Sequence, residues 1–291
     1  MRFLVFGSSG MAGHLISRYL VERGHYVEGF CRHPAADYRE ISGDVRDTDL
    51  VEKVVCEGNY DVIINAIGIL NRDAERDKSQ AVFANAFFPH YLASLVQSTE
   101  CRIFHMSTDC VYRGNTGPYD EMSFPDGTSF YDRSKALGEL CDDHNLTFRN
   151  SIVGPDINPA GIGLMNWFMQ QEGEVKGYSN AIWTGLTTLE LAKAMEYAAL
   201  YGGSGLVNMV PECAISKYDL LVLFNRYLCS DSLTVTPYSD FKLDKTLMRR
   251  NFAIDYRPSS YEEQIREIAE WIRSHCNLYP HYKSFGRGTN E

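Results

Sequence analysis

Tyr131 and Lys135 are four positions apart, the spacing that places two side chains on the same face of a helix. A free tyrosine has a pKa of about 10, so its phenol stays protonated at neutral pH. A neighbouring ammonium favours the phenolate and makes the tyrosine a usable acid–base group. Thr108 follows a hydrophobic run and can supply a hydroxyl to the same pocket. Tyr131, Lys135 and Thr108 are therefore the candidate catalytic residues; an ordinary surface pair is the alternative for the first two.

A glycine-rich turn follows the first apolar run of the chain. Its glycines have G-x-x-G-x-x-G spacing, which differs from the G-x-G-x-x-G of the general dinucleotide fingerprint. Such a turn lets the backbone approach a phosphate, and the helix after it offers free N–H groups and a positive dipole end. The alternative is a turn that serves only close helix–strand packing. The predicted cofactor-binding residues of the turn are Gly7, Ser9, Gly10, Met11, Ala12 and Gly13.

The end of the second predicted strand bears on the choice of cofactor. NAD sites commonly have an acid there that binds the ribose 2′-hydroxyl, whereas this chain has Arg32. A guanidinium suits a 2′-phosphate, so the sequence favours NADPH, with NADH as the alternative. The preference disappears if Arg32 is only a solvated loop charge. Five further cofactor contacts are predicted in two later turns: Asp44, Val45, Ala66, Ile67 and Gly68.

These residues need a scaffold, and the first half of the chain alternates short apolar runs with helical patterns. That alternation is typical of βαβ units and a parallel sheet. We expect strands at 2–6, 26–31, 61–66, 101–107, 146–153 and 205–210, and helices at 11–23, 48–56, 79–97, 164–171, 189–201, 216–227 and 261–275. The predicted fold class is α/β, a Rossmann-type doubly wound parallel sheet with a smaller C-terminal substrate lobe.

The expected domain organisation has three parts. Residues 1–153 form the dinucleotide-binding domain, residues 154–280 form a mainly substrate-binding lobe that is partly woven back into the sheet, and residues 281–291 form a polar tail. The boundary falls where glycine, asparagine and proline become frequent after residue 153. The chain shows no internal repeat and no low-complexity segment.

Composition excludes several function classes. The net charge of −10 argues against broad binding to nucleic acids or anionic membranes. No run of about 18 apolar residues occurs, so no membrane-spanning helix is expected. The eight cysteines lack CxxC or Cys/His ligand spacing, which favours a reduced, cytoplasmic setting without a metal site. The oligomeric state stays open, and a homodimer is compatible with the sequence.

Taken together, these residues resemble the extended short-chain dehydrogenase/reductases, and within them the dTDP-4-dehydrorhamnose reductase group. The resemblance extends over about residues 1–265. It rests on the glycine turn, Asn65-Ala66, Ser107-Thr108-Asp109, Tyr131 and Lys135 followed by Gly138-Glu139, and Leu243-Asp244-Lys245. The Ser-Thr-Asp element is the more specific one, because Tyr-x-x-x-Lys is common to the whole superfamily.

The resemblance implies that the chain uses NADPH to reduce the C4 ketone of a nucleotide-linked 4-keto-6-deoxy sugar. It implies that Tyr131 protonates the carbonyl oxygen, that Lys135 lowers the tyrosine pKa and holds the nicotinamide ribose, and that Thr108 hydrogen-bonds the same oxygen. Tyr131 and Lys135 are both also predicted to bind the cofactor. Asn85 is expected to support this network. Nucleotide-sugar contacts are predicted at Asp109, Asn166 and Trp183, with core positions as the alternative for the last two.

Two departures from the group leave other functions open. Cys110 stands where an aromatic residue is usual, and residues 152–188 differ from the reductase pattern, so the sugar and its nucleotide are both undetermined. A sugar-nucleotide epimerase or dehydratase is one alternative, although Asp109 lacks the second acid that a dehydratase typically has beside the threonine. A non-catalytic NADP-binding regulatory subunit is the other, and the intact Thr108, Tyr131 and Lys135 argue against it.

Overall fold

The central element is a seven-stranded sheet in which every neighbouring pair is parallel. A computed structural model describes residues 1–282 of the chain. In sheet order the strands are β10 (Gly205–Asn208), β6 (Leu146–Arg149), β5 (Arg102–Met106), β4 (Val62–Asn65), β1 (Arg2–Phe6), β2 (Tyr26–Cys31) and β3 (Glu40–Ser42). Parallel order with helical crossovers is the Rossmann-type arrangement, which confirms the predicted fold class.

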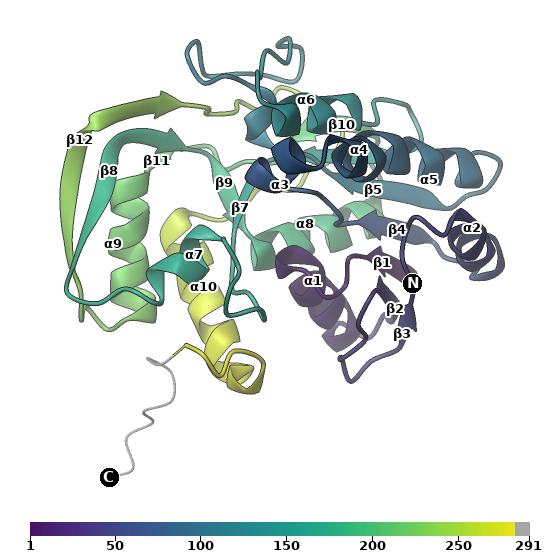
Figure 1. The fold of residues 1–291 in the computed structure, drawn as a ribbon, viewed down its shortest axis with the longest axis horizontal. Helices are drawn as coiled ribbons and strands as arrows, with labels where there is room; N and C mark the ends of the chain where they lie inside the picture. The colour runs from purple at the N-terminus through teal and green to yellow at the C-terminus, as the bar shows by residue number, and fades with distance from the viewer. Residues whose placement is uncertain (283–291) are drawn as a thin grey trace.

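Helices cover both faces of this sheet (Figure 1). One face carries α1 (Met11–Glu22) and α8 (Thr188–Tyr201), and the other carries α2 (Thr48–Glu57), α5 (Phe88–Val96) and α6 (Phe130–Leu137). Side chains alternate between the faces along a strand, so Phe3 and Val5 join one apolar core while Leu4 and Phe6 join the other. The sheet therefore separates two packed cores and presents its strand ends at one edge.

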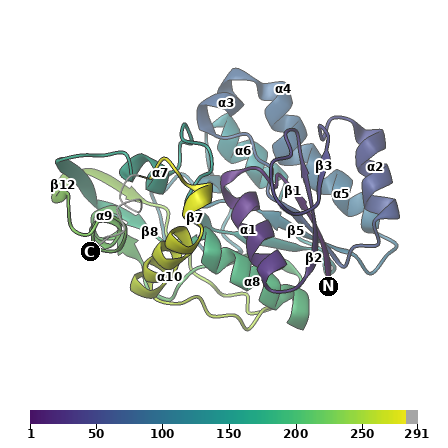
Figure 2. The same cartoon turned by 90° about the horizontal axis from the view of Figure 1, so that it is seen from below.

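A three-stranded sheet forms the part of the molecule farthest from β3 (Figure 1). Its strands are β11 (Ile215–Ser216), β8 (Glu174–Trp183) and β12 (Thr234–Asp244), and α9 (Lys217–Leu228) packs against it. Helix α10 (Tyr261–Ser274) packs against both α9 and α8, and Figure 2 shows it between the small sheet and the Rossmann helices. The sequence predicted α9 and α10 but neither β8 nor β12.

Two predicted elements are divided in the structure. The strand expected at 146–153 is interrupted at Asn150: β6 stays in the large sheet, whereas β7 (Ser151–Val153) pairs with β9 (Gly185–Thr187). The helix expected at 79–97 consists of α4 (Lys78–Ala81), a π-helical segment at Val82–Phe87, and α5. The remaining helices are short: α3 (Asn71–Arg76), α7 (Leu164–Phe168) and two 3₁₀ turns at Asp109–Val111 and Cys276–Leu278.

The end of the described chain returns to the body of the protein. Tyr282 lies within the predicted tail but is buried, and its hydroxyl accepts a hydrogen bond from the backbone N–H of Asp156 at 2.9 Å. The rest of the predicted tail, residues 283–291, lies outside the described residues. Within residues 1–282, we find no helix with the length and apolar character needed to span a membrane.

Candidate active site

The glycine turn joins β1 to α1 with little space to spare. Gly7 has a φ of +84°, in the region that favours glycine, and its N–H donates to the carbonyl of Phe30 at 2.9 Å. A Cβ on Gly13 would lie 2.0 Å from the carbonyl oxygen of Gly7, so only glycine fits there. Helix α1 starts at Met11 without a side-chain cap, which leaves backbone N–H groups available for an anion.

A pocket of about 450 Å³ lies beside this turn. The predicted cofactor residues that line it are Gly7, Ser9, Gly10, Arg32, Asp44, Val45, Ala66, Ile67 and Gly68. Met11, Ala12 and Gly13 are absent from this lining and form the first turn of α1. The structure thus brings three separate predicted turns together around one pocket. That these residues bind a cofactor stays a prediction.

Three arginines place positive charge at this pocket. Arg32, Arg46 and Arg76 line it; Arg46 pairs with Asp44 at 2.6 Å and Arg76 with Asp73 at 2.8 Å. The hydrogen bonds from Arg46 lower the pKa of Asp44 to about 2, so that carboxylate is ionised and already has a partner. Arg32 is exposed at the end of β2, where a 2′-phosphate is expected in a dinucleotide site.

Glu40 is an acid near the turn that the sequence did not single out. It begins β3, and its carboxylate accepts hydrogen bonds from Ser8 Oγ at 2.7 Å and from the N–H groups of Ala35 and Ala36 at 2.7 and 2.9 Å. The side chain therefore fastens the loop after β2 to the glycine turn. Only the pairing of β3 with β2 reveals this role, because Glu40 is remote from the turn in sequence.

Tyr131 lies on α6 as its spacing predicted, in a buried position with 7% exposure. The helix begins with a capping box in which Ser129 and Asp132 bond each other's backbone N–H. Tyr131 packs in an apolar cluster with Ile69 and Cys110. Burial raises the pKa of Tyr131 above its usual value, and the nearby Thr108 hydroxyl only partly opposes this.

The pKa of Tyr131 is therefore raised rather than lowered, and Lys135 is not among the main groups that shift it. Lys135 is also buried, and its ammonium donates to the carbonyl of Met106 at 2.6 Å and lies 3.4 Å from Nε2 of His105. Burial lowers the pKa of Lys135 to about 8. The ammonium is thus directed to the end of β5, and Tyr131 stays protonated at neutral pH, as a proton donor must be.

Thr108 and Asp109 follow β5 after Ser107 and are both buried. The Thr108 hydroxyl accepts from the N–H of Cys110 at 3.1 Å and donates to the Asp109 carboxylate at 3.2 Å. Burial raises the pKa of Asp109, while the positive charges of Lys217 and Lys245 oppose the rise. Lys245 belongs to the Leu243-Asp244-Lys245 element of the resemblance, whereas the sequence did not connect Lys217 with this site.

Asn85 joins the strand ends to the helix that carries Tyr131. Its amide exchanges two hydrogen bonds with the backbone of Ile69, at 2.8 and 2.9 Å, and donates to Ser134 Oγ at 3.0 Å. The residue lies in the π-helical segment, a distortion that is frequent at functional sites. A Cβ on Gly138 would lie 1.9 Å from the Asn85 carbonyl oxygen, so the two helices touch through backbone atoms.

Asn166 and Trp183 both occupy interior positions. The Asn166 amide donates to the carbonyl of Gly161 at 2.7 Å and so holds the loop before α7. Trp183 is 3% exposed, packs against Tyr261, and has the Nζ of Lys217 4.3 Å from its ring centroid. Contact between substrate and these two residues stays a prediction.

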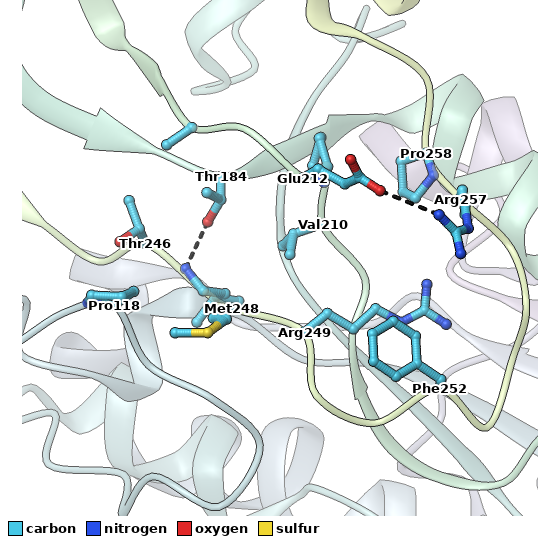
Figure 3. A pocket seen from close by; sticks show the side chains of 13 residues that line it. Pro118, Thr184, Val210, Glu212, Thr246, Met248, Arg249, Phe252, Arg257 and Pro258 are labelled. Atoms are coloured by element: carbon cyan, nitrogen blue, oxygen red, sulfur yellow. Dashed lines mark hydrogen bonds and ion pairs between the residues drawn. The ribbon is translucent and has the colours of Figure 1, made fainter.

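A second pocket, of about 470 Å³, lies mainly among C-terminal segments (Figure 3). Met248, Arg249 and Phe252 line one side, and the ion pair between Arg257 and Glu212 lies across from them. The exposed Phe252 ring offers an apolar wall. Sequence inspection missed this pocket because residues distant in sequence form it.

The comparison with known proteins decides the family. The family model described as the RmlD substrate binding domain matches residues 1–147, slightly more than half of the chain. The chain belongs to this family. The match contains the glycine turn, Thr108, Tyr131 and Lys135, and it confirms the resemblance to dTDP-4-dehydrorhamnose reductases of the extended short-chain group.

Similar proteins include reductases from archaea and bacteria. A probable low-salt glycan biosynthesis reductase of Haloferax volcanii is 33% identical over 48% of this chain, and a dTDP-4-dehydrorhamnose reductase of Aggregatibacter actinomycetemcomitans is 32% identical over 47%. These alignments span 48% and 45% of the two relatives, about half of each. The solved dTDP-4-dehydrorhamnose reductase of Bacillus anthracis in complex with NADP shares the fold, with a TM-score of 0.75, 19% identity and coverage of 92% of this chain and 98% of that one.

Proposed function

We propose that this chain is an NADPH-dependent reductase of the C4 ketone of a nucleotide-linked 4-keto-6-deoxy sugar. The observation that carries the proposal is the interaction of the buried Tyr131 with the hydroxyl of the buried Thr108, with Lys135 buried four positions from Tyr131 on the same helix. Ile69 connects these residues to the pocket, because it packs against the apolar cluster that contains Tyr131 and also lines the pocket. Reductase relatives of the same family support the same assignment.

The pocket beside the glycine turn suits NADPH. The first turn of α1 offers N–H groups to the pyrophosphate, and Gly7 and Gly13 let the backbone come close to it. Arg32 supplies charge for the 2′-phosphate at the end of β2. When bound, NADPH supplies the hydride for the reduction.

The chain's own residues handle the proton and the developing charge. Tyr131 is protonated at neutral pH and donates its phenolic proton to the ketone oxygen, which becomes the product hydroxyl. Thr108 turns its hydroxyl from Asp109 towards the same oxygen and stabilises the charge that develops there. The Lys135 ammonium donates to the Met106 carbonyl, so its positive charge lies at the end of the strand that leads to Thr108.

We further propose that residues 154–280 supply most of the substrate site. The pocket in Figure 3 belongs largely to this part of the chain, and its Phe252 and Met248 side chains offer apolar walls to a nucleobase. Thr184 and Thr246 line it and directly follow Trp183 and Lys245 in the chain. Lys245, whose positive charge opposes the rise in the pKa of Asp109, is therefore the chain neighbour of a residue that lines this pocket.

The test is NADPH oxidation with a panel of dTDP- and UDP-linked 4-keto-6-deoxy sugars, using the wild-type chain and Tyr131→Phe. General acid–base groups contribute about 100-fold to 10,000-fold in rate, so the variant should lose at least about 100-fold in kcat. Its NADPH affinity should not change, because Tyr131 is replaced by a ring of the same size. Turnover by Tyr131→Phe equal to that of the wild-type chain would show that Tyr131 is not the proton donor. A wild-type chain that binds NADPH but reduces no panel member would contradict the proposed activity.

A further inference from the structure

The loop that carries Arg32 has little packing of its own. It connects β2 to β3, which lie side by side at one end of the large sheet (Figure 1). The side chains of residues 32–37 are all exposed, so the apolar cores do not fix this loop. A loop without packed side chains pays conformational entropy when it binds a ligand, unless other contacts already hold its backbone. Polar contacts must therefore hold the loop if Arg32 is to meet a phosphate in a defined place.

Glu40, the first residue of β3, contacts the chain on both sides of Arg32. Its Oε2 accepts hydrogen bonds from the N–H groups of Ala35 and Ala36 at 2.7 and 2.9 Å. Its Oε1 lies 3.5 Å from the Sγ of Cys31, the last residue of β2. Because Cys31 directly precedes Arg32 and Ala35 follows it within the loop, one carboxylate spans the segment that contains Arg32.

The same carboxylate reaches the glycine turn. Its Oε1 accepts a hydrogen bond from the hydroxyl of the buried Ser8 at 2.7 Å. Gly29 is the residue of β2 that pairs with Glu40, and a Cβ there would lie 2.5 Å from Ser8 Oγ and 3.1 Å from Glu40 Cγ. The contact thus depends on a glycine at this position of β2. One group therefore holds the glycine turn and the Arg32 loop together.

The Glu40 carboxylate is already filled by these contacts. A carboxylate has about four acceptor positions, and four donors of the chain, two on each oxygen, occupy those of Glu40. Burial alone would raise the pKa of Glu40, but the hydrogen bonds that it accepts outweigh burial and lower this pKa. Of Glu40 and Arg32, only Arg32 lines the pocket beside the glycine turn. A ribose hydroxyl would have to displace one of the four donors to bind Glu40.

We propose that Glu40 is a positioning residue for cofactor choice, which holds the Arg32 guanidinium where the 2′-phosphate of NADPH binds. This inference rests on the proposed function, since it requires that NADPH occupies the pocket beside the glycine turn. NAD sites commonly have an acid at the end of the second strand that accepts from the ribose 2′-hydroxyl. Glu40 lies on the neighbouring strand and acts in the opposite sense, because its oxygens bind the chain and not the ribose.

The test separates the reach of the Glu40 side chain from its charge. Glu40→Asp keeps the charge but is one methylene group shorter, so its carboxylate cannot contact Ser8 and the loop together. Glu40→Gln keeps the reach, since its amide oxygen accepts from the loop while its amide N–H donates to Ser8 Oγ. Fluorescence titration of the full chain should show NADPH binding about threefold to tenfold weaker in Glu40→Asp, at most the loss of one charge-assisted hydrogen bond, with unchanged NADH binding. Glu40→Gln should retain most of the preference for NADPH.

Two further variants show whether Glu40 acts through Arg32. In an Arg32→Ala background, Glu40→Asp should cause no further loss of NADPH affinity, because the group that it positions is absent. Glu52→Asp, at an exposed carboxylate on α2, is the matched control and should change neither affinity. Urea unfolding of each variant measures stability independently of the cofactors.

Several results would overturn the inference. Unchanged affinities in Glu40→Asp, or equal losses for NADPH and NADH, would leave Glu40 with a structural role only. A larger loss for NADH would make Glu40 a ribose ligand, and tighter NADPH binding by Glu40→Gln would show that its charge repels the 2′-phosphate. Additive losses from Arg32→Ala and Glu40→Asp would show that Glu40 acts independently of Arg32. A wild-type chain that binds neither cofactor would instead contradict the proposed function, so the two failures are distinguishable.

Discussion

The ammonium of Lys135 lies 2.6 Å from the carbonyl oxygen of Met106, the last residue of β5. This bond connects the helix that carries Tyr131 to the strand end that leads to Thr108. Both catalytic candidates are consequently positioned by one buried contact between helix and sheet. This contact buries the cation, and burial lowers the pKa of Lys135 to about 8.

The first prediction is that the rate of ketone reduction falls as the pH rises through about 8. Below that pH Lys135 is an ammonium that bonds Met106 and stabilises negative charge; above it the residue loses its proton. Tyr131 stays protonated across this range, because burial raises its pKa. The measurement is kcat against pH with saturating substrate and NADPH.

Lys217 also has its pKa lowered to about 8 by burial, so it needs a control. The Lys217→Met variant should keep the fall in kcat, because the fall is assigned to the Lys135 ammonium. A profile that stays flat through pH 8 in the wild-type chain would contradict the role of the Lys135 charge.

Local sequence patterns were enough to predict the parts of the site that depend on one element. Each of these patterns lies within a few residues of the chain. They are the spacing of Tyr131 and Lys135, the glycine turn, and the apolar runs of β1 and β4. The gathering of Arg32, Asp44 and Ala66 at one pocket also followed, because parallel strands end at a common edge. Asn85, which the resemblance assigned to the active-site network, is buried.

Other features depend on contacts between distant segments. Strand β12 is largely exposed and contains Pro237, a residue that argues against a strand unless it lies at an edge, as this one does. The run that contains β6 and β7 gives no sign of the change of sheet at Asn150. No local pattern links Lys217, at the start of a predicted helix, with Asp109, because the two residues are far apart in sequence.

The second prediction concerns the choice of cofactor. Arg32→Ala should weaken NADPH binding about tenfold or more, the effect of losing one charge-assisted hydrogen bond, and leave NADH binding nearly unchanged. Fluorescence titration with both cofactors measures the two affinities. Arg133→Ala, an exposed arginine on α6, is the matched control. Equal losses of affinity for NADPH and NADH would show that Arg32 does not bind the 2′-phosphate.

The third prediction tests the tight glycine turn. Gly13→Ala would place a Cβ 2.0 Å from the Gly7 carbonyl oxygen, so the turn must move. Overpacking of this kind costs about 1–3 kcal/mol, and NADPH binding should weaken with it. Gly10→Ala is the control for stability alone, because its nearest atom would be 3.3 Å away. Urea unfolding measures both variants, and equal stability for the two would show that the turn tolerates the added methyl group.

The fourth prediction concerns the ion pair behind Thr108. Arg149 holds both oxygens of Glu139 at 2.6 and 2.7 Å, with side-chain exposures of 3% and 5%, and Ser107 Oγ donates to Glu139 at 2.6 Å. Removing one partner leaves a buried charge without compensation, so Arg149→Met should lower the free energy of unfolding by about 3–5 kcal/mol.

The double variant Glu139→Leu, Arg149→Met removes both charges and should be more stable than Arg149→Met alone, because no uncompensated charge remains. Ser107 then loses its acceptor, and since it precedes Thr108, kcat should fall although stability recovers. Urea unfolding and turnover of both variants separate the two effects. If the two substitutions destabilise additively, the side chains contribute independently, and if kcat recovers with stability, Glu139 does not position the strand end that carries Thr108.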